Sequence, residues 1–181
     1  MAVDIIEQIK QYVSNADVQK IDPNTQAPVN SEIQNTDAKS AAIPLVLAAF
    51  YKHTRNKEDA ENLLKLNDEQ TAQELFRGEE QNASSMLSNF SSDSSDHATN
   101  TIQKIIAATK KVLNDNLKKL DGDSVVNFFS AQRSTILKHL PAELHVGDLL
   151  NDPTMDDKTN KMEGPMSGLM HGIEKIFSST K

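Results

Sequence analysis

The most apolar stretch of the chain covers residues 37–52, and it constrains the fold more than any other segment. Its apolar run, residues 43–50, is too short to span a membrane, because a spanning helix needs roughly 20 apolar residues. Five alanines favour helix over strand in this stretch. A helix that is apolar on nearly all sides is a buried helix, so the rest of the chain has to cover it.

Pro44 lies inside this predicted helix. An internal proline removes a backbone hydrogen bond and costs about 3 kcal/mol. Pro44 therefore either kinks the helix or occupies the first position of a helix that starts near Ala42. A third alternative is that a kink opens a ligand pocket beside Pro44 and Phe50.

The composition narrows the class of protein. The chain has 181 residues, of which 37% are hydrophobic, and it contains neither Trp nor Cys. This length is typical of one domain, and the absence of Cys excludes disulfides and thiolate metal sites. The net charge of −7 argues against general nucleic-acid binding, which needs a basic face. The first residues lack the features of a signal peptide, so we expect a cytoplasmic protein without a transmembrane segment.

Helical periodicity recurs along the chain, and no stretch alternates as a strand would. We therefore predict an all-α, multi-helical bundle of roughly seven to nine helices. Residues 1–150 should form a single helical domain, with halves of about 1–90 and 96–150 joined by a Ser-rich linker whose last Asp, Asp96, caps the next helix. The longest predicted helix covers residues 96–120, and Pro141 ends the helix over 125–140. Residues 151–181 should form a polar loop and a C-terminal helix over 165–177.

A short sequence pattern recurs in the two halves of the chain. Residues 43–52 and 102–111 share the pattern Ile-x-x-[Val/Ile]-[Leu/Ile]-Ala-Ala-x-x-Lys. Two helices that face one core can converge on such a pattern, and a weak pseudo-duplication of two helical halves can also produce it. Both explanations stay open.

Gln132 is a polar residue within an apolar seam. It lies four residues from both Phe128 and Ile136, so we expect it to point into the core with them. A buried amide needs hydrogen-bond partners. We therefore expect Gln132 to bond backbone groups at a helix end or beside Pro44, and contact with a ligand is the alternative.

Four segments resemble the bacterial family named domain of unknown function 937. These are residues 42–50 (Ala-Ile-Pro-Leu-Val-Leu-Ala-Ala-Phe), 59–64 (Asp-Ala-Glu-Asn-Leu-Leu), 128–137 (Phe-Phe-Ser-Ala-Gln-Arg-Ser-Thr-Ile-Leu) and 140–144 (Leu-Pro-Ala-Glu-Leu). The chain departs from that family at Gln103, where a second Pro is frequent, and at Asp59, where a Gly is usual. The resemblance implies an all-helical bacterial protein, and its packing motifs supply no catalytic residue.

The sequence offers no catalytic constellation, so we expect a protein that is not an enzyme and holds no cofactor or metal. No two of the five His residues have the spacing of a helical zinc motif. Ser167 and His171 lack an orienting acid and the strand of a nucleophile elbow. Structural roles are therefore expected for the residues singled out, which are Pro44, Phe50, Gln132 and Pro141.

The charge is distributed unevenly. Residues 56–80 carry a net charge of −5, whereas residues 101–120 carry +4. Opposite charges of this kind pair within a fold or between subunits, and they predict salt-sensitive self-association. The first functional hypothesis is a non-catalytic helical interaction or scaffold protein, with an unknown protein partner or a second copy of itself. The alternative is a small-ligand-binding protein or enzyme with a pocket beside Pro44, and nucleic-acid binding would require the lysines to cluster on one surface.

Overall fold

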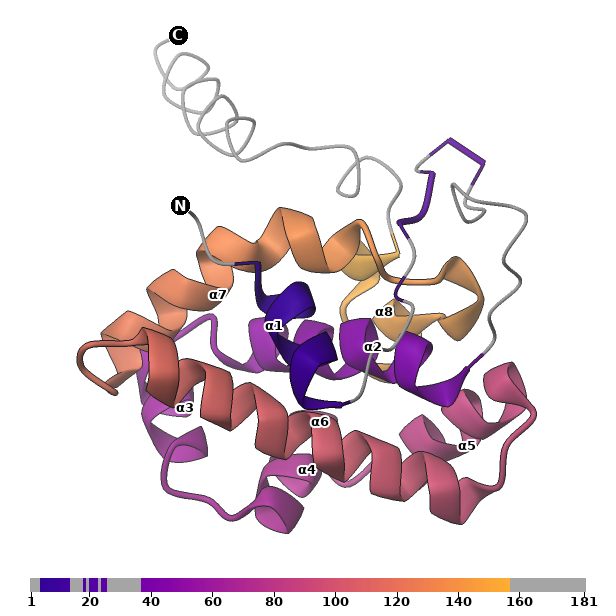
Figure 1. The fold of residues 1–181 in the computed structure, drawn as a ribbon, viewed down its shortest axis with the longest axis horizontal. Coiled ribbons are helices and arrows are strands. Elements are labelled where there is room, and N and C mark those ends of the chain that lie inside the picture. Colours follow the sequence, from indigo (N-terminus) through magenta and orange to yellow (C-terminus); the bar gives the residue numbers. More distant parts are fainter. Residues whose placement is uncertain (1–3, 14–17, 19, 23, 26–36, 157–181) are drawn as a thin grey trace, which may run out of the picture.

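The computed structural model describes residues 4–13, 18, 20–22, 24–25 and 37–156. These residues form eight α-helices, two short 3-10 helices and no β-strand, which confirms the all-α prediction (Figure 1). The elements are α1 (Ile5–Tyr12), α2 (Ala38–His53), α3 (Lys57–Leu63), α4 (Asp68–Phe76), α5 (Glu80–Ser91), α6 (Ser95–Asn116), α7 (Gly122–Leu137), η1 (Ala142–Leu144), α8 (Val146–Leu149) and η2 (Pro153–Met155). The predicted helix over 165–177 lies outside the described residues.

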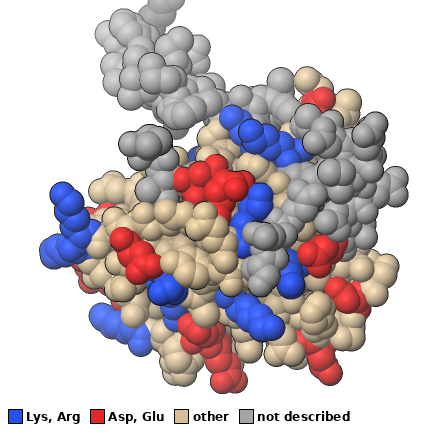
Figure 2. All heavy atoms as spheres, viewed as in Figure 1, with Lys and Arg blue, Asp and Glu red and all other residues tan. Residues whose placement is uncertain are grey.

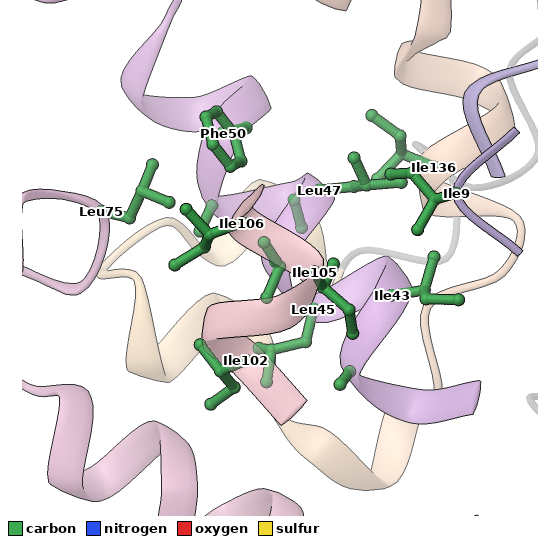
Figure 3. Packing of buried hydrophobic residues seen from close by; sticks show 14 of the residues in the cluster. Ile9, Ile43, Leu45, Leu47, Phe50, Leu75, Ile102, Ile105, Ile106 and Ile136 are labelled. Carbon is green, nitrogen blue, oxygen red and sulfur yellow. The ribbon is translucent and has the colours of Figure 1, made fainter. Parts of the chain in front are cut away.

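The helix α2 occupies the centre of the bundle, as its apolar sequence predicts. It contacts α1, α4, α5, α6 and α7, which surround it in Figure 1. Its side chains are buried continuously from Ser40 to Phe50. Figure 3 shows the residues of α2 interleaved with those of its neighbours; the labelled ones are Ile9, Ile43, Leu45, Leu47, Phe50, Leu75, Ile102, Ile105, Ile106 and Ile136.

Pro44 lies inside α2 and is buried. The helix begins at Ala38, after the N-cap residue Asp37, so the alternative in which Pro44 is the first helical residue is wrong. The ring of Pro44 removes the hydrogen bond that a backbone N–H would donate to the carbonyl of Ser40. Packing on every side of α2 compensates for this loss, because tertiary contacts outweigh a local helix penalty.

The Ser-rich segment is a tight turn and not a flexible linker. The helix α5 ends at Ser91, Ser92 adopts a left-handed conformation with φ of 56°, and α6 begins at Ser95. The Ser94 hydroxyl accepts a hydrogen bond from the backbone N–H of His97, so Ser94 caps α6 and the prediction for Asp96 was wrong. The two halves therefore join directly, and α5 packs along α6.

The long helix ends earlier than its charge and apolar pattern indicated. It stops at Asn116, and the side chain of Leu120 is 44% exposed. Asp121 then caps α7, with its carboxylate accepting a hydrogen bond from the N–H of Ser124. Gly122 is needed here because a Cβ atom at this position would lie 2.5 Å from the carbonyl oxygen of Lys57 in α3.

The hydrophobic core continues past the expected end of the domain. Leu150 and Met155 are both buried in the same cluster as α2. The packed domain thus includes η2, which lies within the segment predicted to be a polar loop from residue 151. None of the described helices is long and apolar enough to cross a membrane.

Candidate functional site

Pro44 and Phe50, beside which a ligand pocket was one alternative, both lie within packed core. Phe50 is 1% exposed, and its ring stacks on that of Phe129 at a centroid distance of 5.5 Å and an interplanar angle of 8°. Aromatic pairs in this offset-stacked arrangement stabilise a core beyond the area they bury. Among the described residues this packing fills the space beside Phe50, so the geometry lends no support to a pocket there.

Gln132 lies where the periodicity of its helix places it, but with Phe129 and Ile136 as buried neighbours on α7 and not with Phe128. The backbone N–H of Ile5 donates a hydrogen bond of 3.3 Å to Gln132 Oε1. Ile5 is the first residue of α1, whose leading N–H groups have no partner within the helix. Gln132 thus provides an acceptor at a helix end, which is one of the roles expected for it.

Pro141 follows α7 without forming its end. The helix stops at Leu137, and Pro141 is the N-cap residue of η1. The N–H of Ile21 donates to the carbonyl oxygen of Lys138 at 2.8 Å, so the connection before Pro141 also holds the segment around Ile21.

The surface carries an open groove between α1, the start of α2 and α6. Its volume is about 490 Å³. The apolar residues that line it, which we call its floor, are Val13, Ile105, Ala107 and Ala108. The groove is lined by Tyr12, Val13, Lys39, His97, Thr101, Lys104, Ile105, Ala107, Ala108 and Lys111, and we name it the cationic groove.

Three lysines give the cationic groove its charge. Among the described residues, no carboxylate lies within ion-pair distance of Lys39 or Lys104, whereas Lys111 is 3.8 Å from Asp115. Figure 2 shows basic and acidic side chains interspersed on this face of the molecule. Lysines that form no ion pair with a described residue can bind an anionic group.

Tyr12 forms one wall of the cationic groove. Its hydroxyl donates a hydrogen bond of 2.8 Å to the carboxylate of Asp115, and the Lys111 ammonium lies 5.4 Å from the centre of its ring. The hydrogen bond to Asp115 raises the pKa of Tyr12 above its ordinary value. One turn earlier, Gln8 and Asn116 exchange hydrogen bonds between their side-chain amides. These contacts fix α1 on α6 and so fix the width of the groove.

A second cluster lies at the C-terminal edge of the described domain. Metal-ligating atoms of His145, Asp148 and Asp156 all lie within 4.8 Å of one another. His145 and Asp148 also line a depression of about 410 Å³ beside α5, whose other lining residues are Met86, Asn89, Phe90, Glu143, Leu144 and Leu149. An imidazole and two carboxylates form a ligand set that divalent transition metals accept.

Ion pairing and hydrogen bonding position this cluster. Asp152 is buried, its carboxylate lies 2.7 Å from the guanidinium of Arg55 at the end of α2, and it accepts hydrogen bonds from Thr154. Burial raises the pKa of Asp152, but the bonds from Thr154 and Arg55 outweigh it and hold the pKa below its ordinary value. With η2 anchored in this way, the side chain of Asp156 lies against α8, where the N–H of Gly147 donates a hydrogen bond of 2.9 Å to Asp156 Oδ2.

Sequence reasoning found neither the cationic groove nor this cluster. The groove combines Val13, Lys39 and Lys104, which come from three separate segments and carry no joint local signal. His145 and the acidic residues that follow it do not have the spacing of a helical zinc motif. The His-x-x-Asp spacing of His145 and Asp148 is a local signal that was available, but it is common by chance.

The chain was also compared with known proteins. No protein-family model matches it, and no curated protein and no solved structure is similar to it. The resemblance to domain of unknown function 937 therefore stays a prediction.

Proposed function

We propose that this protein is a non-catalytic helical interaction protein that binds an acidic, amphipathic helix of a partner protein in the cationic groove. The observation that carries the proposal is the combination of an apolar floor with Lys39 and Lys104, which have no acidic partner among the described residues. A helix with an apolar stripe flanked by carboxylates matches this combination, because helix-in-groove recognition pairs one apolar face with a groove.

The floor of the groove favours a protein helix over nucleic acid. Val13 and Ala107, the apolar lining residues that are not buried, have no side-chain hydrogen-bonding group, whereas nucleic-acid binding sites need a wider basic face and exposed rings for stacking. The ring of Tyr12 already lies beside the Lys111 ammonium.

Fluorescence anisotropy with a labelled, designed peptide tests the proposal. The probe is an amphipathic helix of Leu, Ala and Glu, and its matched control carries Lys in place of each Glu. The double variant Lys39→Gln/Lys104→Gln should weaken binding of the acidic probe about fivefold, since each exposed charge pair contributes on the order of 0.5 kcal/mol. The double variant Lys65→Gln/Lys118→Gln makes the same change in net charge outside the groove and should bind the probe as the parent protein does.

Three results would contradict the proposal. The first is equal binding of the acidic and basic peptides, and the second is equal loss of affinity in the two double variants. The third is tighter binding of a single-stranded oligonucleotide than of the acidic peptide, with the same dependence on Lys39 and Lys104, because that would make the groove a nucleic-acid site.

The setting we propose for this interaction is the bacterial cytoplasm. The resemblance to domain of unknown function 937 supports the bacterial origin. Fluorescence microscopy of a fusion expressed in a bacterial host tests the location.

A further inference from the structure

The side chains of His145, Asp148 and Asp156 converge at the C-terminal edge of the described domain. Their ligand atoms lie within 4.8 Å, yet no ion pair within 4.0 Å joins His145 to either carboxylate among the described residues. Ligand atoms around a tetrahedral zinc ion, with bonds of about 2.1 Å, lie about 3.4 Å apart. The ring nitrogens of His145 therefore lie farther from both carboxylates than in an occupied site, by less than about 1.5 Å, a difference that side-chain rotation can close.

The two carboxylates of this cluster have no cation to balance them within the described residues. Asp148 and Asp156 lack an ion pair with any Lys or Arg, whereas the nearby Asp152 has Arg55. Two like charges this close repel each other. A bound divalent cation would turn this repulsion into attraction.

Asp156 supplies a second, independent observation. Its Oδ2 accepts the hydrogen bond from Gly147, but its Oδ1 is shielded from solvent and has no hydrogen-bond partner among the described residues. A buried carboxylate oxygen without a partner is costly. Metal-ligating carboxylates are themselves held by such hydrogen bonds, and a Cβ atom at residue 147 would collide with the Asp156 carboxylate.

From this geometry we infer that His145, Asp148 and Asp156 form a binding site for a divalent transition-metal ion of the zinc class. An imidazole nitrogen with two carboxylates suits zinc, manganese or iron, whereas magnesium and calcium prefer oxygen ligands alone. Three protein ligands leave a coordination position for water or a small ligand. Since His145 and Asp148 line the depression beside α5, that position is accessible from solvent. The bound ion joins α8 to η2 and holds the C-terminal edge of the core.

Isothermal titration calorimetry of the untagged, full-length chain with Zn²⁺ tests this site, after removal of metals with a chelator. One zinc ion should bind per chain, more tightly than Mg²⁺, and it should raise the melting temperature. Co²⁺ should give the visible absorption of a four-coordinate site.

Three single variants remove one ligand each: His145→Asn, Asp148→Asn and Asp156→Asn. Asn suits position 145 because His145 has a φ of 43°, which Asn tolerates. At position 156, the side-chain carbonyl oxygen of Asn can still accept the hydrogen bond from the N–H of Gly147. Each variant should lower the zinc affinity at least tenfold, since removal of an outer-shell partner alone costs about 10- to 100-fold. The controls His97→Asn and Asp123→Asn make the same changes at exposed residues outside the cluster and should bind zinc as the parent protein does.

The inference is overturned if the parent chain binds no zinc, or if the three variants bind it as tightly as the parent. Loss of affinity in the controls to the same extent would also overturn it, since it would indicate adventitious binding by surface groups. Circular dichroism establishes that each variant is folded. Because His145 and Asp148 are exposed, their variants decide the matter even if Asp156→Asn fails to fold.

Discussion

At the scale of single residues, Gln132 joins α7 to the beginning of α1. Its Oε1 accepts the N–H of Ile5, and the side chains of Ile5, Ile6 and Ile9 then pack into the core. A buried N–H that loses its acceptor costs about 1–3 kcal/mol. Removing the Gln132 acceptor should therefore lower stability mainly because it leaves the N–H of Ile5 buried without this partner.

Replacing Gln132 with Leu tests this role. Gln132→Leu should lower the free energy of unfolding by about 1–3 kcal/mol, although Leu is the more hydrophobic residue, and urea denaturation measures the change. The control Gln103→Leu makes the same substitution on the half-buried side of α6 and should change stability by less than about 0.5 kcal/mol. A Gln132→Leu protein as stable as the parent would contradict the structural role.

His139 is a buried titratable residue on the loop after α7. Its Nδ1 lies 2.7 Å from the carbonyl oxygen of Thr135, and since a carbonyl oxygen only accepts, Nδ1 carries the proton and donates this hydrogen bond. Burial lowers the pKa of His139 below its ordinary 6.5, although Thr135, Asp4 and Glu7 oppose this shift and Lys20 adds to it. The folded protein therefore binds fewer protons here than the unfolded chain as the pH falls.

This shift predicts a loss of stability in acid. The contribution of His139 is present in full above about pH 6.5 and is lost as the pH falls from there through the folded-state pKa. His139→Asn removes the titrating ring and keeps an N–H donor for Thr135, so its free energy of unfolding should depend less on pH between 7 and 5. The same slope in His139→Asn as in the parent protein would refute the prediction.

At the scale of elements, the turn between α5 and α6 is built from serines with distinct roles. Ser91 Oγ donates to the carbonyl of Leu87, Ser92 adopts the left-handed conformation, and Ser94 caps the next helix. A Ser-rich composition is equally typical of a linker, so the sequence alone favoured the wrong structure. What distinguishes the two is the packing of α5 on α6, which involves residues far from the turn.

A glycine in this turn should stabilise the protein. Ser92 has a φ of 56°, a conformation that Gly adopts without the steric cost of a Cβ atom. Ser92→Gly should therefore raise the free energy of unfolding by about 0.5–1 kcal/mol. Ser91→Gly, one residue earlier and inside the helix, should lower the free energy of unfolding by a similar amount. Thermal denaturation should therefore give a higher melting temperature for Ser92→Gly and a lower one for Ser91→Gly. An unchanged or lowered melting temperature for Ser92→Gly would contradict the assignment.

At the scale of the whole molecule, the sequence predicted what depends on local patterns. The central helix α2 was predicted from its own apolar residues, and the structure confirms it. The capping box of Asn67 and Gln70 and the cap at Asp121 likewise involve only residues that are three apart in the chain. The cationic groove and the cluster of His145 with Asp148 and Asp156 depend on how separate elements pack, and that information is not local. The sequence therefore predicted the fold class better than either candidate site.

The uneven charge along the chain is partly balanced within the fold. Lys110 of α6 forms an ion pair of 3.0 Å with Asp68 of α4 and also donates to the carbonyl of Leu66. Lys104 faces the cationic groove instead and has no acidic partner among the described residues. Exposed carboxylates such as Glu58 and Glu69, on α3 and α4, lie on the acidic segment of the same molecule. The groove of one copy can thus attract the acidic surface of another.

We therefore expect weak self-association that depends on salt. Copies with a net charge of −7 repel each other overall, so association should appear only at high protein concentration and through local patches of opposite charge. Light scattering should give a mass above that of the monomer at low ionic strength and the monomer mass in 1 M salt, where the screening length falls to about 3 Å. The double variant Lys39→Gln/Lys104→Gln should reduce the mass that light scattering gives at low salt. The control Lys65→Gln/Lys118→Gln should leave this mass unchanged. A monomer at both salt concentrations would exclude self-association through the groove.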